Sequence, residues 1–257
     1  MNYSDIYVLG NDNRMDYVAQ KLYNMGYEVY RELEDIKENS VIVLPPPVGD
    51  NALEEILPKL CLGQLIYGGA VSKTFLNECE MKNIRVVDYL KIENVTWENA
   101  KLTAKGIIKT AEGYGGIKKE SKCLITGYGY CGKALARELK NYTPNVTVMV
   151  RRKELKSQIE EDGFSFIHME KRALELSEFD YIFNTVPSMV LDKNRLEEIK
   201  AGCAILDIAS APGGTDFSYC KEKNISAGLF LGIPGKMYPK EAGEIIADAI
   251  IYDLNSI

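Results

Sequence analysis

Three glycines at a fixed spacing are the residues in this sequence best suited to hold a ligand. Gly127, Gly129 and Gly132 follow the apolar run 123–126 and precede a helical pattern at 133–139. In such a turn the first glycine permits the bend, the second lets the backbone approach a pyrophosphate, and the third lets helix and strand pack closely. The segment therefore predicts a dinucleotide site made by Gly127, Tyr128, Gly129, Tyr130, Cys131 and Gly132. A plain strand-turn-helix without a ligand is the alternative.

Cations close the next strand pattern, where a dinucleotide fold meets the adenosine ribose. NAD sites usually place Asp or Glu there, whereas this chain has Arg151, Arg152 and Lys153. Guanidinium groups pair well with a 2′-phosphate. The turn therefore predicts NADP rather than NAD, and a solvated basic turn is the other interpretation.

Three later segments also follow strand patterns and are expected at the same edge of a sheet. Asn184, Thr185, Val186 and Pro187 would lie on the nicotinamide side, where they could hold ribose or carboxamide. The glycine-rich loops 207–217 and 232–236 would permit close backbone approach to a planar ligand. Turn formation without ligand contact is the alternative for each.

Two strand-to-helix turns in the first half carry cations. Residues 10–14 end in Arg14, and residues 68–73 end in Ser72 and Lys73. Helix N-termini beside such side chains suit carboxylate groups. Solvent-exposed helix capping explains each single residue equally well.

Short β-branched or aromatic runs alternate with amphipathic stretches from end to end, which predicts an α/β protein of two doubly wound domains. We expect the second to be a Rossmann dinucleotide-binding fold with six strands. The expected strands are 6–9, 28–31, 41–44, 64–67 and 85–88, then 122–126, 146–150, 165–168, 181–184, 203–208 and 226–230. The expected helices include 14–25, 53–60, 73–81, 97–111 and 240–254.

Glycines at 113, 115 and 116 end the long helical pattern and mark a domain boundary. We therefore expect a substrate-side domain with linker helix at 1–116, a Rossmann NADP-binding domain at 117–238, and a helix at 239–257 that returns to the first domain. A cleft between the domains is expected to close by motion at these glycines and near Pro239.

Composition narrows the function classes. The net charge of −6 argues against nucleic acid as a partner. The N-terminus lacks the features of a signal peptide and no apolar run is long enough to span a membrane, so we expect a cytoplasmic protein. Six scattered cysteines are expected to be reduced, and a single histidine, His168, leaves little material for a His-based metal centre or a Ser-His-Asp triad. No metal is predicted.

Several motifs resemble one known family, the NADP-binding subunits of dipicolinate synthase, the sporulation enzyme that makes dipicolinic acid. The motifs are residues 184–191, 206–217 and 232–243, and residues 10–14 resemble the opening turn of the family more weakly. The resemblance implies an NADP-linked oxidation of a dihydrodipicolinate-type precursor to dipicolinate. It also implies a flavoprotein-like second subunit. Whether the chain forms a homo-oligomer stays open.

The planar dicarboxylate substrate that this resemblance implies needs groups to bind its carboxylates and orient its ring. We expect substrate contacts from Arg14, Ser72, Lys73, Ser210 and Thr215, and assign catalytic orientation to Lys236 and Arg14. One alternative is another NADP-dependent dehydrogenase of the 2-hydroxyacid or alanine dehydrogenase type. The other is a catalytically silent NADP-binding subunit that regulates its partner.

Overall fold

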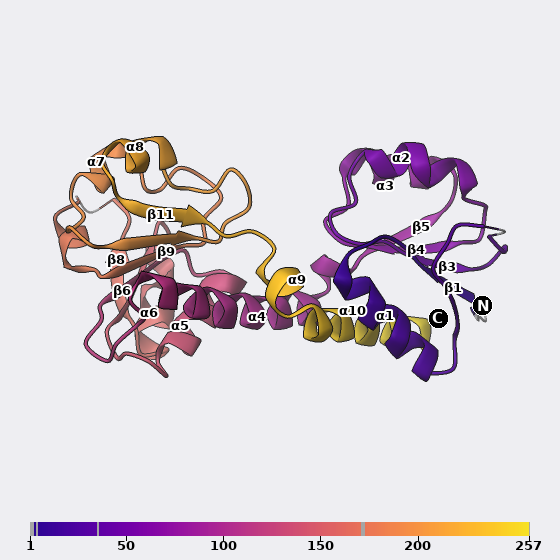
Figure 1. Cartoon of the computed structure of the whole chain (residues 1–257), viewed down its shortest axis with the longest axis horizontal. Coiled ribbons are helices and arrows are strands. Elements are labelled where there is room, and N and C mark those ends of the chain that lie inside the picture. Colours follow the sequence, from indigo (N-terminus) through magenta and orange to yellow (C-terminus); the bar gives the residue numbers. More distant parts are fainter. Residues whose placement is uncertain (1–2, 4, 35, 171–172, 257) are drawn as a thin grey trace. The chain divides into compact units, whose positions relative to one another are not determined.

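The chain forms two compact units, each built around one parallel sheet (Figure 1). The computed structural model describes residues 3, 5–34, 36–170 and 173–256. The first unit comprises residues 1–99 and 234–257, and the second comprises residues 100–233.

The first unit contains a five-stranded parallel sheet in the order β2-β1-β3-β4-β5. This order is typical of doubly wound folds, in which the chain reverses its winding direction between the first and third strands. Its elements are β1 (Asp5–Val8), α1 (Asn13–Asn24), β2 (Glu28–Tyr30), β3 (Val41–Val43), α2 (Asn51–Glu55), the 3₁₀ helix η1 (Leu57–Lys59), β4 (Leu65–Gly68), α3 (Lys73–Met81), β5 (Arg85–Asp88) and the 3₁₀ helix η2 (Tyr89–Lys91).

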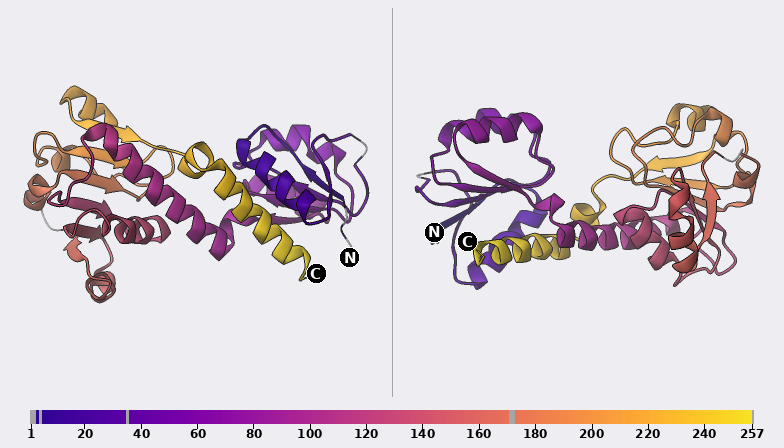
Figure 2. Two further views of the ribbon diagram at one scale, coloured as in Figure 1. Left: turned by 60° about the horizontal axis from the view of Figure 1, so that its bottom comes forward. Right: turned by 180° about the vertical axis from the view of Figure 1, so that it is seen from behind.

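Side chains alternate between the two faces of this sheet because successive strand residues point in opposite directions. Ile6 and Val8 belong to a core with α1 and the C-terminal helix α10 (Pro239–Leu254). Tyr7 lies in a second core with residues of α3 and η1. Figure 2 shows α10 (yellow) alongside α1 (indigo), and Tyr67 donates a hydrogen bond to Asp253 at 2.6 Å that fixes the end of α10 to β4.

The second unit contains a six-stranded parallel sheet in the order β11-β10-β9-β6-β7-β8, which is the order of a complete dinucleotide-binding fold. Its elements are β6 (Cys123–Thr126), α5 (Tyr130–Leu139), β7 (Val146–Val150), η4 (Lys153–Leu155), α6 (Lys156–Glu161), β8 (Ser165–His168), η5 (Ala173–Glu178), β9 (Tyr181–Asn184), α7 (Lys193–Leu196), β10 (Ala204–Asp207), α8 (Phe217–Glu222) and β11 (Ser226–Leu229). The predicted fold class, including the returning C-terminal helix, is confirmed.

The unit boundaries lie away from the expected positions at 116/117 and 238/239. One boundary lies between Asn99 and Ala100, inside α4 (Glu93–Ala111), and the 3₁₀ turn η3 (Glu112–Tyr114) follows that helix. The reason is packing: Ala104, Ile107 and Ile108 of α4 belong to the core of the second unit. The other boundary precedes Pro234, in the short helix α9 (Ile233–Met237), which the sequence pattern did not predict.

Candidate functional site

The glycine turn lies at the carboxyl end of β6, in the middle of the second sheet. Gly129 is the residue before α5, has an extended backbone (φ −83°, ψ −162°) and supplies no side-chain cap. The N-terminal N–H groups of α5 are therefore left to another acceptor. The Gly127 N–H donates to the Met149 carbonyl at 2.9 Å, which joins the turn to the end of β7.

The three glycines differ in what an added side chain would meet. Gly127 has φ +93°, and an added Cβ would lie 2.5 Å from Oγ1 of Thr185. A Cβ on Gly132 would collide with the carbonyl oxygen of Gly127, so helix and turn touch directly. A Cβ on Gly129 would meet no atom within 4 Å. The space beside Gly129 is open, whereas the other two glycines are required by the fold itself.

The other turn residues contact the protein in different ways. The Tyr128 ring is buried, its hydroxyl donates to Asp162 at 2.6 Å, and burial raises the pKa of that phenol. Cys131 packs against the core, and burial raises the pKa of its thiol. Tyr130 is exposed. Tyr128 and Cys131 could therefore contact a ligand through their backbone groups rather than their side chains.

The cationic turn after β7 is exposed at Arg151, Arg152 and Lys153. Its backbone is held by His168, whose Nε2 lies 2.8 Å from the Arg151 carbonyl. His168 itself is buried at the end of β8. The histidine thus packs beneath the turn.

The segment after β9 supports the glycine turn from the side. The Thr185 hydroxyl donates to the Thr126 carbonyl at 2.7 Å, and Val186 would lie 2.9 Å from a Cβ on Gly127. Asn184 is fully buried, and its amide binds Asp207 at 2.9 Å and the Val186 carbonyl at 3.0 Å. Pro187 is exposed. Asn184 therefore orients this segment, and its side chain is already engaged inside the protein.

Asp207, at the end of β10, organises the neighbouring loop and was given no role by the sequence patterns. Its buried carboxylate accepts hydrogen bonds from Asn184 Nδ2 (2.9 Å), Ala209 N (3.0 Å), Gly214 N (2.8 Å) and Thr215 Oγ1 (2.8 Å). The signal in the sequence is an acidic residue that closes an apolar strand before two glycines. Thr215 is consequently buried with its hydroxyl proton committed to Asp207, whereas Ser210 is exposed.

Gly214 brings two of the predicted segments into contact. A Cβ there would lie 2.5 Å from the Val186 carbonyl oxygen and would collide with that of Ser188. The Gly214 carbonyl accepts hydrogen bonds from Val190 (2.8 Å) and Leu191 (2.9 Å). The structure thus gathers the glycine turn, the segment 184–188 and the loop 207–215 at the carboxyl edge of β6, β9 and β10.

In the first unit, Arg14 is an engaged cation. Its Nε and Nη2 donate to the Asp12 carboxylate at 2.8 and 2.6 Å. That hydrogen-bonded pair raises the pKa of Arg14 and lowers the pKa of Asp12. Gly235 packs directly on the guanidinium, since a Cβ there would lie 2.8 Å from Cζ. Only Nη1 of Arg14 is left outside the pair.

The other expected substrate residues of the first unit differ in availability. Ser72 caps α3 by accepting from Phe75 N at 3.1 Å, and its hydroxyl donates to Asp50 at 3.0 Å. Lys73, the first residue of α3, is exposed, as is Lys236 in α9. The two lysines therefore present cations at the surface, whereas Ser72 is occupied by capping.

Close packing in the first unit also leaves no room for a side chain at Gly10 and Gly69. A Cβ on Gly10 would lie 2.7 Å from Pro45, and one on Gly69 would lie 2.7 Å from Pro46 and 2.6 Å from the Tyr89 ring. The loops after β1, β3 and β4 therefore pack on one another at these positions.

Two other kinds of feature are absent from the described residues. Among the residues that the structure describes, no group of His, Cys, Asp and Glu is arranged to hold a metal ion. No helix in the described part of the chain has the length and apolar character needed to cross a membrane.

The fold is similar to that of solved dehydrogenase structures. The solved apo structure of D-lactate dehydrogenase from Escherichia coli matches with a TM-score of 0.69 and 14% identity, over 98% of this chain and 97% of that chain. At this identity the similarity concerns the fold alone.

The resemblance in sequence leads to a narrower group. The A-type subunit of dipicolinate synthase from Bacillus subtilis (strain 168) is 35% identical over 130 residues, which are 51% of this chain and 44% of that protein. The match thus spans less than half of this curated relative. The crystal structure of the corresponding dipicolinate synthase subunit from Bacillus halodurans has a TM-score of 0.88 and 26% identity, over 98% of this chain and 97% of that chain. No protein-family model matches the sequence. The predicted resemblance to this type of dipicolinate synthase subunit is confirmed.

Proposed function

We propose that the chain is a cytoplasmic, NADP-dependent oxidoreductase that converts a dihydrodipicolinate-type precursor to dipicolinate, as one component of a dipicolinate synthase. The observation that carries the proposal is the open space beside Gly129, at the start of a helix with no side-chain cap. The similarity to the A-type subunits of dipicolinate synthase supports the substrate class and a flavoprotein-like partner subunit.

The residues of the second unit would hold the cofactor in distinct ways. Backbone N–H groups at the start of α5 would bind the pyrophosphate, and Arg151, Arg152 and Lys153 would bind the 2′-phosphate. Thr185, Val186 and Pro187 would border the nicotinamide, while Asn184 fixes their backbone through the Val186 carbonyl at 3.0 Å. The bound cofactor supplies a hydride acceptor.

Charge and exposure indicate which residues would bind the substrate. A planar dicarboxylate needs local cations because the chain carries a net charge of −6. Exposed Lys73 and Lys236, with Nη1 of Arg14, would bind and orient carboxylates in the first unit. Exposed Ser210 would contribute a polar contact, whereas the hydroxyl protons of Ser72 and Thr215, expected substrate contacts, are already donated to Asp50 and Asp207. Loss of a hydride and a proton makes the ring aromatic, so alignment of the ring matters more than a strong base.

A second candidate is a catalytically silent NADP-binding subunit that regulates its partner. The observation in its favour is that several expected substrate groups are engaged within the protein. Arg14 is paired with Asp12, Ser72 with Asp50, and Thr215 with Asp207.

Turnover distinguishes the two candidates. The purified chain, with and without its partner subunit, is given freshly generated precursor and NADP, and NADPH absorbance is followed. We expect NADPH to form, and Lys73→Gln and Lys236→Gln each to raise KM for the precursor about tenfold. Lys240→Gln, an exposed lysine on α10, is the matched control. NADP binding without NADPH formation under both conditions would favour the silent role.

Preference for NADP over NAD is the second expectation. We expect NADP to bind at least about tenfold more tightly than NAD, because guanidinium groups pair with the 2′-phosphate. The double variant Arg151→Ala, Arg152→Ala should remove the difference, as measured by calorimetric titration of both cofactors. Lys156→Ala, which removes a nearby exposed cation of α6, serves as control. Equal affinities in the parent protein would contradict the assignment.

A further inference from the structure

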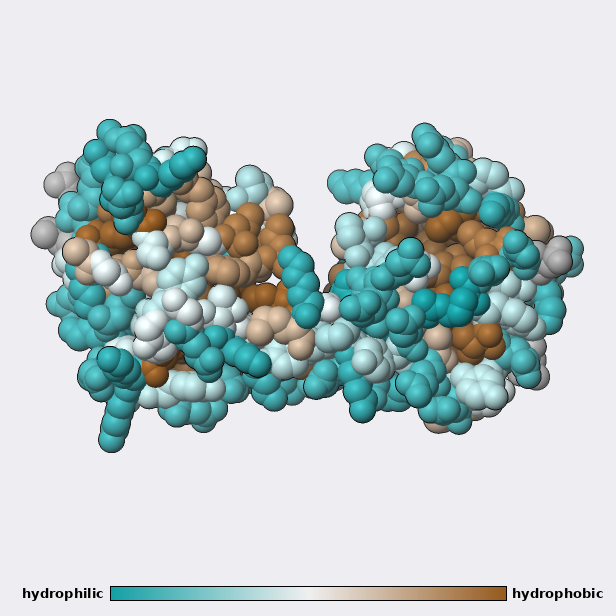
Figure 3. Space-filling view, in the orientation of Figure 1, coloured by the Kyte–Doolittle hydropathy of each residue, from teal (hydrophilic) through white to brown (hydrophobic). Residues whose placement is uncertain are grey.

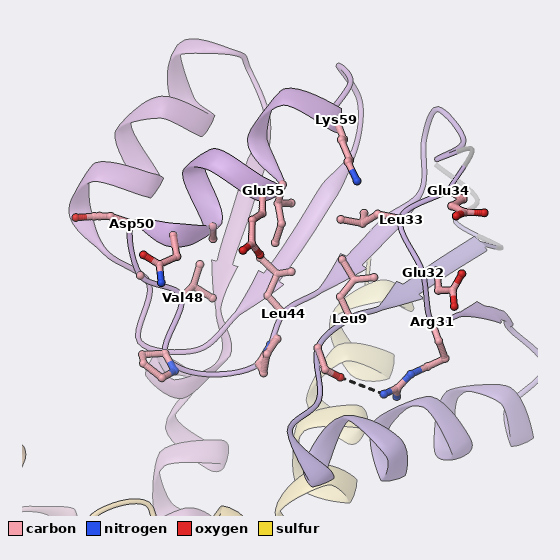
Figure 4. Close-up of a pocket in the computed structure, with 17 residues that line it drawn as sticks. Leu9, Arg31, Glu32, Leu33, Glu34, Leu44, Val48, Asp50, Glu55 and Lys59 are labelled. Atoms are coloured by element: carbon pink, nitrogen blue, oxygen red, sulfur yellow. Dashed lines mark hydrogen bonds between the residues drawn. The ribbon is translucent and has the colours of Figure 1, made fainter.

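The first unit contains a pocket whose lining includes none of the residues assigned to cofactor or substrate. It measures about 1030 Å³ and opens at the carboxyl ends of β1, β2 and β3 (Figure 4). Its walls come from Leu9 and Gly10 after β1, residues 31–34 after β2, residues 44, 45 and 47–49 after β3, and residues 50–52, 55, 56 and 59. The sheet order β2-β1-β3 places it where the winding reverses, which is where ligands bind in open α/β folds.

The interior of this pocket is apolar. The side chains of Leu9, Leu33 and Leu44 converge in Figure 4, and Val48, Ala52 and Ile56 complete the lining. Leu9, Leu44 and Val48 are buried members of the core between the sheet and α3. Figure 3 shows apolar surface in the hollow beneath α2. Such a lining suits an apolar ring or chain, and the volume is that of a small-molecule site.

The charged groups around the pocket are mostly acidic. The lining includes Glu32, Glu34, Asp50 and Glu55, against Arg31 and Lys59. The Asp50 carboxylate is directed away from the pocket in Figure 4 and accepts from the Ser72 hydroxyl at 3.0 Å, so the acidic excess comes from the three glutamates. The Arg31 guanidinium is already engaged within the protein. It forms an ion pair with Asp16 at 2.9 Å and donates to the carbonyls of Met15 (2.8 Å) and Gly10 (3.2 Å).

The backbone N–H groups at the nearby start of α1 already have a carboxylate acceptor. Asp12 caps that helix by accepting from Arg14 N at 2.9 Å, so a carboxylate already occupies the position where a phosphate would bind. The excess of carboxylates therefore repels anions and favours a cation. A dicarboxylate has the wrong charge for this pocket.

We infer that this pocket binds an organic cation, a protonated amine carried on an apolar ring or chain. The apolar part would lie against Leu9, Leu33 and Leu44. The ammonium group would lie by Glu55, whose carboxylate is directed toward Leu44 and Val48 in Figure 4. The ligand differs in charge from the proposed substrate, so this inference is independent of the proposed oxidation.

Three probes of similar shape and different charge test the inference on the full chain. They are phenethylamine, 3-phenylpropanoate and 2-phenylethanol, each titrated by calorimetry and by ligand-observed NMR. We expect phenethylamine to bind at least about tenfold more tightly than 3-phenylpropanoate, with the alcohol between them. The amine affinity should fall as salt is raised, because the attraction is screened.

Two substitutions locate the binding. Glu55→Gln should weaken phenethylamine about fivefold and leave 2-phenylethanol unchanged, whereas Glu54→Gln, its exposed neighbour outside the pocket, should change neither. Ala52→Phe should fill the pocket and abolish binding of all three probes without altering NADP affinity. Tighter binding of the carboxylate, no binding of any probe, or equal effects of Glu55→Gln and Glu54→Gln would overturn the inference. NADP titration of the same samples tests the proposed function separately.

Discussion

Replacing Gly129 with valine is expected to abolish dinucleotide binding while the protein stays folded. The backbone at Gly129 has φ −83°, which valine adopts without strain, and an added Cβ meets no protein atom within 4 Å. The same Cβ would enter the space assigned to the pyrophosphate. We expect NADP affinity to fall at least about 100-fold, measured by calorimetric titration. The loss of glycine before the helix should cost no more than about 1 kcal/mol of stability.

Gly132→Val is the matched comparison, at the last glycine of the same motif. Its Cβ would collide with the Gly127 carbonyl, so this variant should lower the melting temperature strongly. Circular dichroism melts of the two variants therefore separate a fold requirement from a ligand requirement. A Gly129→Val protein that melts like the parent and still binds NADP would mean that the turn is only structural.

The sheet of the second unit could be predicted well from the sequence. Central parallel strands are buried on both faces, so each reads as a short apolar run between polar or glycine residues. The strands Val146–Val150, Ser165–His168 and Tyr181–Asn184 have the predicted bounds. The observed strand order is one of the few that right-handed crossovers allow for six such strands.

Helix ends and the domain boundary were harder to predict. Gly113, Gly115 and Gly116 mark the end of α4 correctly, yet the unit boundary lies earlier because Ala104 and Ile107 pack into the second core. That choice depends on which sheet the helix covers, and periodicity alone cannot reveal it. The short helix α9 contains a proline and a glycine, residues that usually indicate a loop.

Which side chains are already engaged within the protein, and which are free to bind a ligand, was hardest to predict from the sequence. Arg14 and Asp12 are two residues apart, and their pairing at 2.6 Å depends on the first turn of α1. The acidic pocket of the first unit is assembled from loops after three different strands. Sequence spacing identifies which residue types are present, whereas their availability is decided by tertiary contacts.

Removal of the Asp207 carboxylate is expected to destabilise the protein by several kcal/mol. Asp207 is fully buried and accepts four hydrogen bonds, from Asn184, Ala209, Gly214 and Thr215. In Asp207→Ala all four donors would lose their acceptor, and each buried unpaired donor costs about 1 to 3 kcal/mol before relaxation. We expect a loss of about 3 to 5 kcal/mol, measured by denaturant unfolding.

A series of three variants makes this expectation specific. Asp207→Asn can keep its oxygen at the Oδ2 position, where Asn184, Gly214 and Thr215 donate, and place its amide against Ala209 N. It should therefore lose less stability than Asp207→Ala. Asp216→Ala, which removes only the cap that accepts from Tyr219 N at 2.9 Å, should lose about 1 kcal/mol. Because Asp207 also fixes the loop 209–215, NADPH formation should fall in the same order as stability. If Asp207→Ala were as stable as Asp216→Ala, the carboxylate would not be what holds this loop together.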